Sequence, residues 1–145
     1  MMTLLRKLFA VNPARKPARF PRPALEALED RLTLSVTGHG GNILDKAVNF
    51  GFNADPTPSG HLNYWDNAQN IHLVSDAITS FSQTGPNEVT FTGTGHVGTG
   101  PSTFTVTVQD NGEPGTNDTF SIVIMGAGAS SRSGTLSQGN IQIHR

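Results

Sequence analysis

Hydrophobic and polar residues alternate one by one over much of the chain after residue 35. In residues 103–108, Phe104, Val106 and Val108 alternate with threonines, and residues 119–124 repeat the pattern. Successive side chains of a β-strand point to opposite faces, so this period of two predicts strands with one buried face and one hydroxyl-rich face. The same alternation predicts five more strands, in residues 48–52, 62–64, 71–73, 89–91 and 141–143. An eighth strand is expected in residues 77–81.

Short segments rich in glycine, proline and asparagine separate these strands, at residues 55–60, 85–87, 98–101 and 112–115. Connections of this length join neighbouring antiparallel strands, so the chain is predicted to meander. The prediction is an all-β fold, a single small antiparallel β-sandwich or partly closed barrel of about seven or eight strands. Its predicted core consists of the inward-facing large residues: Phe50, Phe52, Leu62, Tyr64, Phe91, Phe104, Val106, Phe120, Ile122 and Ile141.

Two glycines indicate that this sheet is curved. Gly93 and Gly95 share the inward parity of Phe91 in one predicted strand. Glycine at inward positions marks a sharp bend or the close approach of another backbone. A curved sandwich or partly closed barrel therefore fits better than a flat sheet.

The first 40 residues are predicted to form a separate leader, and residues 41–145 the β-domain. The leader contains a proline- and arginine-rich stretch at residues 13–23, which favours extended conformations. After it, Leu25, Leu28 and Leu32 follow the i, i+3, i+7 spacing of one helix face. A short amphipathic helix is expected there, in an otherwise mostly disordered leader.

Charge separates the same two parts. Residues 1–35 contain seven Lys and Arg against three acids, whereas residues 36–145 contain three bases against eight acids. This asymmetry is typical of a targeting segment attached to an acidic body, and it argues against nucleic-acid binding by the body. No apolar run approaches the roughly 18 residues of a transmembrane helix. Cysteine is absent, which excludes thiol catalysis and cysteine-ligated metals.

Residues 25–35 read Leu-Glu-Ala-Leu-Glu-Asp-Arg-Leu-Thr-Leu-Ser. This segment resembles the N-terminal sorting segment of planctomycete surface and exported proteins. It departs from that pattern at two positions: Ala27 stands where the family often has Pro, and Thr33 interrupts the usual leucine pair. The resemblance implies an extracellular or cell-surface location and a contact with export or surface-retention machinery. The residues that match the motif are Leu25, Glu26, Leu28, Glu29, Asp30, Arg31 and Leu32. An arginine-rich leader of another kind, or a helix that covers the body, is the alternative.

The body resembles a small β-domain that often follows choice-of-anchor-A modules in bacterial secreted proteins. The likeness lies in residues 58–64, 90–95, 103–115 and 139–144. It implies a non-catalytic extracellular accessory module with an undefined ligand, and it transfers no catalytic residues. Here the domain stands directly behind a sorting leader, which departs from the usual arrangement.

The connection between residues 110 and 118 is the main metal candidate. Its oxygen-bearing residues are Asp110, Asn111, Glu113, Asn117 and Asp118. Such hard donors in a glycine-containing loop suit Ca²⁺, although the spacing is not that of an EF-hand. The same residue types also make ordinary turns, through side-chain bonds to the backbone and positive φ angles. No other cofactor is expected.

Histidine, aspartate and tryptophan supply the remaining candidates for chemistry. A hydrolase site would require His61, Asp66, His72 and Asp76 to meet across strands, and no catalytic motif in the sequence supports that arrangement. Trp65 follows the inward Tyr64 and should therefore face outward, where an aromatic ring could stack on a sugar or anchor a protein. A tryptophan tucked under a loop is nevertheless the favoured interpretation.

Three functions follow from these observations. The first is a non-catalytic exported or cell-surface β-module with a structural or binding role, whose partner is a cell-wall polymer or a protein. The second is a calcium-dependent adhesive or carbohydrate-binding domain that uses residues 110–118 or Trp65. The third is an uncharacterised hydrolase.

Overall fold

A computed structural model describes residues 34–41 and 47–145 of the chain. The predicted amphipathic helix and the sorting residues 25–32 lie outside the described residues. The chain divides into two units, residues 1–33 and residues 34–145. All the strands described below lie in the second unit.

In the described residues, nine strands form a single antiparallel sheet in the order β8-β7-β6-β5-β4-β3-β2-β1-β9. Their bounds are β1 Ser35–Gly41, β2 Val48–Asp55, β3 Ser59–Asp66, β4 Ile71–Gly85, β5 Glu88–Val97, β6 Gly100–Gln109, β7 Thr119–Gly126, β8 Ser130–Thr135 and β9 Gln138–His144. One 3₁₀ turn, η4 (Gly115–Asn117), lies between β6 and β7. The predicted meander is confirmed from β1 to β8, and β9 then returns to pair with β1.

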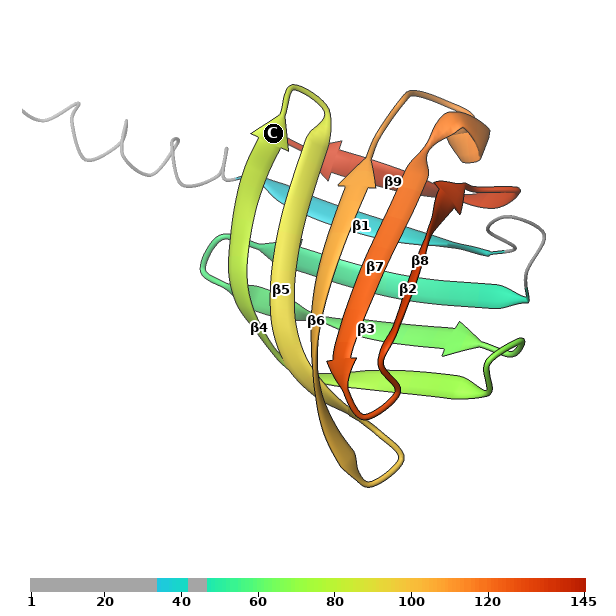
Figure 1. Ribbon diagram of the computed structural model, residues 1–145. Coiled ribbons are helices and arrows are strands. Elements are labelled where there is room, and N and C mark those ends of the chain that lie inside the picture. Colours follow the sequence, from blue (N-terminus) through green and yellow to red (C-terminus); the bar gives the residue numbers. More distant parts are fainter. Residues whose placement is uncertain (1–33, 42–46) are drawn as a thin grey trace, which may run out of the picture. The chain divides into compact units, whose positions relative to one another are not determined.

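The sheet curls into a half-barrel, so the predicted all-β class and its partial closure are confirmed. Figure 1 shows β5, β6, β7 and β8 as one layer that crosses a second layer formed by β9, β1, β2 and β3. The long strand β4 belongs to both layers, with one end in each. The core lies between the two layers.

The bend of β4 occurs where the two inward glycines of β5 lie opposite it. The register of the β4–β5 pair shifts between Ser75 and Ala77 and again between Ile78 and Ser80. A Cβ on Gly93 would collide with the Ala77 carbonyl oxygen, and one on Gly95 would collide with that of Val74. The predicted bend is therefore confirmed, and its cause is close contact between two backbones.

Three predictions about strands and boundaries need correction. Residues 77–81 are not a separate strand, because they continue β4 beyond its bulges. Strand β8 was not predicted, because its sequence SSRSGT contains no apolar residue and so no hydrophobic alternation. Strand β1 was assigned to the leader, yet residues 35–41 pair with both β2 and β9, so the predicted boundary after residue 40 is too late.

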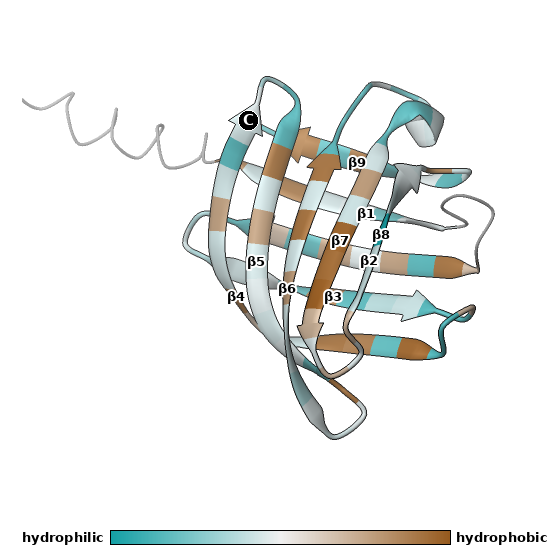
Figure 2. Cartoon of the chain, viewed as in Figure 1, coloured by the Kyte–Doolittle hydropathy of each residue, from teal (hydrophilic) through white to brown (hydrophobic). Residues whose placement is uncertain are grey.

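Phenylalanine rings fill the space between the layers. All ten residues predicted for the core are buried, with at most 5% of their surface exposed. Phe120 from β7 stacks on Phe50 from β2 with ring centroids 3.9 Å apart, and Tyr64 of β3 lies 6.2 Å away. Figure 2 shows the alternating brown and pale bands along the strands that result from one apolar and one polar face.

Candidate ligand-binding face

The outer surface of the layer formed by β9, β1, β2, β3 and the first part of β4 carries polar side chains with one large aromatic. We call it the amide face, and the register brings its members together from five strands. Its members are Thr37, His39, Asn49, Asn53, His61, Asn63, Trp65, His72 and Gln138. No Asp, Glu, Lys or Arg is among these nine residues. Two carboxylates lie beside them: Asp55 follows Asn53 at the same parity of β2, and Glu113 contacts Asn140 and Gln142 of β9.

Trp65 is the largest exposed side chain of this face. Its backbone pairs with Asn49 of β2 on one side and with His72 of β4 on the other. The Trp65 and His72 rings stack with centroids 4.0 Å apart and planes 10° from parallel. The tryptophan is 42% exposed, whereas the preceding Tyr64 is fully buried. The parity argument for an outward Trp65 is therefore confirmed, and the favoured interpretation of a tryptophan tucked under a loop is wrong.

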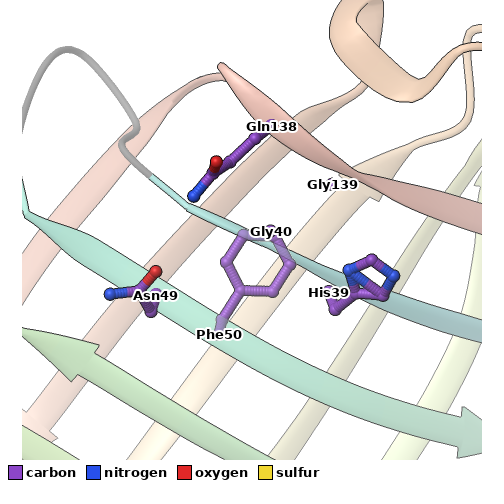
Figure 3. Close-up of a pocket in the computed structure, with 6 residues that line it drawn as sticks. All are labelled: His39, Gly40, Asn49, Phe50, Gln138 and Gly139. Carbon is purple, nitrogen blue, oxygen red and sulfur yellow. The ribbon is translucent and has the colours of Figure 1, made fainter.

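Glycines leave the amide face hollow beside this aromatic pair. Gly51 pairs with His39 and Asn63, and a Cβ placed on it would meet no atom within 4 Å. A shallow cavity of about 410 Å³ lies nearby and is lined by His39, Gly40, Asn49, Phe50, Gln138 and Gly139. Figure 3 shows the three polar side chains around the bare backbone of Gly40 and Gly139, with the Phe50 ring between β1 and β2.

The outer surface of the other layer has a different character, because its hydroxyl groups bond to one another. Thr90 and Thr107 lie 3.0 Å apart across β5 and β6, and Ser80 lies 2.6 Å from Thr92. Hydroxyls that are paired in this way have less capacity left for a ligand. The amide face is therefore the stronger candidate for binding.

Residues 110–118, the predicted calcium loop, lie along the edge of β9 and bind its backbone N–H groups. The Asp118 carboxylate, fully buried, accepts the backbone N–H of Asn111 at 2.7 Å and that of Ile141 at 2.8 Å. Asp110 accepts the N–H of Ile143 in the same strand at 3.0 Å. Two carboxylates thus satisfy backbone donors along an edge that would otherwise be open to pairing.

Glu113 and Asn111 of this loop also make hydrogen bonds within the protein. Glu113 accepts the side-chain amides of Asn140 and Gln142, both at 3.2 Å. The Asn111 amide donates to the Asn117 carbonyl at 2.8 Å. Within residues 34–41 and 47–145, no group of three His, Asp or Glu side chains is arranged to hold a metal ion. The geometry matches the turn interpretation, and calcium binding stays a prediction.

Burial raises the pKa of the Asp118 carboxyl above its usual range. The two backbone hydrogen bonds act in the opposite direction, while the nearby charges of Asp110 and Glu113 raise the pKa further. Loss of solvation outweighs the two hydrogen bonds because the carboxylate has no cation beside it in this part of the structure.

A second buried carboxylate joins the two layers, and its partner was missed by the sequence analysis. Asp66 at the end of β3 is fully buried and accepts a hydrogen bond from Arg132 Nε of β8 at 2.6 Å. The Gln69 N–H donates to the other Asp66 oxygen at 3.0 Å. Arg132 is one of only three Lys and Arg residues after residue 35. This scarcity of bases is the sequence signal that could have identified Arg132.

The Asp66 pKa is lowered. Burial alone would raise it, but the Arg132 hydrogen bond, the backbone donors of Gln69 and Ala68 and the Arg132 charge together outweigh that effect. The Tyr64 hydroxyl is buried beside this pair, and its pKa is raised by burial and by the Asp66 charge. The cluster fastens the edge strand β8 to the turn after β3.

We predict that these two carboxylates respond to acid in opposite directions. The stability that Asp66 contributes is complete above its ordinary pKa of about 3.9 and is lost as the pH falls through its lowered native value. Asp118 binds its proton more tightly in the native state, so its effect on stability becomes more favourable as the pH falls from neutral towards about 4.

Urea unfolding of the native sequence, Asp66→Asn and Asp118→Asn between about pH 3 and pH 8 measures both effects. As the pH falls, the advantage of the native sequence over Asp66→Asn should shrink, and its advantage over Asp118→Asn should grow. Parallel slopes for the two variants would contradict this assignment.

The predicted hydrolase residues do not converge. Asp66 is buried against Arg132, whereas His72 stacks on Trp65 on the outer side of the sheet. Asp76 lies 3.1 Å from His96 on another strand, and His61 is exposed opposite Asn53. The four side chains form no shared pocket in the described part of the chain.

Comparison with known proteins finds no matching family model, no matching curated protein and no matching solved structure. Within residues 34–41 and 47–145, no helix has the length and apolar character required to cross a membrane.

Proposed function

We propose that the chain is a non-catalytic exported or cell-surface β-module that binds a ligand through the amide face. The observation that carries this proposal is the exposed Trp65–His72 stack beside a hollow whose lining residues carry no formal charge. An exposed tryptophan costs solvation free energy and adds nothing to the core, so a binding role accounts for it better than a structural one.

The leader supports the exported location. Its residues 25–35 resemble a surface and export sorting segment, and its basic charge contrasts with the acidic body. Export or surface-retention machinery would recognise the leader, while the amide face would bind a cell-wall polymer or another surface component.

Cell fractionation with N-terminal sequencing tests the location. We expect the full chain in the surface or medium fraction, and we expect a variant with alanine at Glu29, Asp30 and Arg31 to remain inside the cell. A matched variant with alanine at Arg15, Lys16 and Arg19 changes the same number of charged residues outside the motif. If the first variant still reaches the surface, the sorting function of residues 25–35 is refuted.

A further inference from the structure

We infer that the ligand of the amide face is a neutral polysaccharide, which deepens the proposed binding function and rests on it. The first argument is the orientation of the aromatic pair. His72 covers one face of the Trp65 indole, at a centroid distance of 4.0 Å. The register places Asn49 on the side of Trp65 opposite to His72. The indole face on the Asn49 side is therefore the one that a ligand can stack on.

Space is available next to that indole face. The Asn49 Oδ1 atom would lie 2.5 Å from a Cβ on Gly41, so the Asn49 amide leans over β1, away from Trp65. Gly51, the next outward position of β2, carries no side chain, and no atom lies within 4 Å of the place where its Cβ would be. A flat ring can therefore lie against the indole with its edge above Gly51.

The polar groups around this space suit hydroxyl ligands. Side-chain amides both donate and accept hydrogen bonds, as sugar hydroxyls do, and Asn49, Asn53, Asn63 and Gln138 supply four of them. The C–H face of a sugar ring is apolar and can stack on an aromatic ring. The nine residues of the amide face carry no formal charge, and the Glu113 carboxylate at its β9 side already accepts the Asn140 and Gln142 amides. The face therefore offers no cation to an acidic polymer.

The shape favours a chain over a single sugar or a protein. From Trp65 on β3 to Gln138 on β9 the face spans three strand spacings, about 14 Å. It is shallow, so an extended polymer can lie along it. A protein partner would need a larger apolar centre than one tryptophan among amides provides.

Cosedimentation with isolated cell envelopes of the host tests the inference. We expect the full chain to bind untreated and protease-treated envelopes, and to lose binding after periodate has oxidised the sugar diols. Trp65→Ala should weaken binding about tenfold or more, because a central aromatic anchor is removed. Gly51→Leu should do the same by filling the hollow, and it should fold normally because the site is open.

Val123→Ala is the matched control, since Val123 is 41% exposed on the outer surface of the other layer, and it should bind normally. The melting temperature of each variant separates loss of binding from loss of folding.

Trp65 is the only tryptophan in the chain, so its fluorescence reports on this site alone. Neutral polysaccharide extracted from the envelopes should change the emission of the native protein, and the acidic fraction should not. Binding that survives periodate but not protease would overturn the polysaccharide ligand while leaving the proposed binding module in place. A response to the acidic fraction alone would overturn its neutral character. Envelope binding unaffected by Trp65→Ala and Gly51→Leu would refute the amide face itself.

Discussion

Replacing Phe120 with alanine is expected to lower the free energy of unfolding by about 3–5 kcal/mol. Phe120 is fully buried, stacks on Phe50 at 3.9 Å and lies 6.2 Å from Tyr64, so its ring fills the space between the two layers. Removing it forfeits these contacts and leaves a cavity that rigid strands on both sides prevent from collapsing. Urea unfolding monitored by circular dichroism measures the loss.

Val123→Ala provides the comparison within the same strand, because Val123 faces solvent. It should cost about 1 kcal/mol or less. Equal losses for Phe120→Ala and Val123→Ala would mean that β7 contributes through strand formation alone and that the aromatic cluster is unimportant.

Asp118→Ala is expected to cost about 2–4 kcal/mol, because it leaves the buried N–H of Ile141 and the partly buried N–H of Asn111 without their acceptor. The same change uncovers the edge of β9, so the variant should also aggregate more readily. Chemical unfolding and light scattering measure the two effects.

Asn117→Ala is the control for this loop. Asn117 was predicted as a calcium ligand together with Asp118, but its side chain is exposed, so the substitution should change stability by about 0.5 kcal/mol or less. Millimolar Ca²⁺ should leave the melting temperature of the native protein unchanged. A rise that Asn117→Ala abolishes would instead support the calcium interpretation, since a ligand of the native state must stabilise it.

The core could be predicted from the sequence because each of its strands repeats a local signal. Phe104 and Val106, or Phe120 and Ile122, reveal their shared face within a few residues. The same parity rule points Trp65 outward from the buried Tyr64 next to it, although a tryptophan tucked under a loop was the favoured interpretation. Strand β8 carries no such signal, because it lines the barrel with Arg132 and small residues instead of apolar ones.

The amide face and the buried ion pair depend on long-range register that no local pattern contains. Asp66 and Arg132 meet across 66 positions of sequence, and Asn49 lies beside Trp65 only through the β2–β3 register. The pairing of β9 with β1 places Gln138 on the same face, although nothing in either strand specifies its neighbour. The role of residues 110–118 at the edge of β9 could not be predicted for a related reason, since the N–H groups that their carboxylates accept belong partly to a distant strand.

The return of β9 to β1 also has a consequence for how the chain acquires its structure. Residues 35–41 form the start of the sheet, and their second partner is made of residues 138–144. Contacts between such distant segments carry a large loop-closure cost and slow the folding of β proteins. During synthesis the first strand must therefore wait, with one side unpaired, until nearly the whole domain has been made. A chain that has not reached residue 138 should accordingly remain a substrate for chaperones and for transport in an unfolded state.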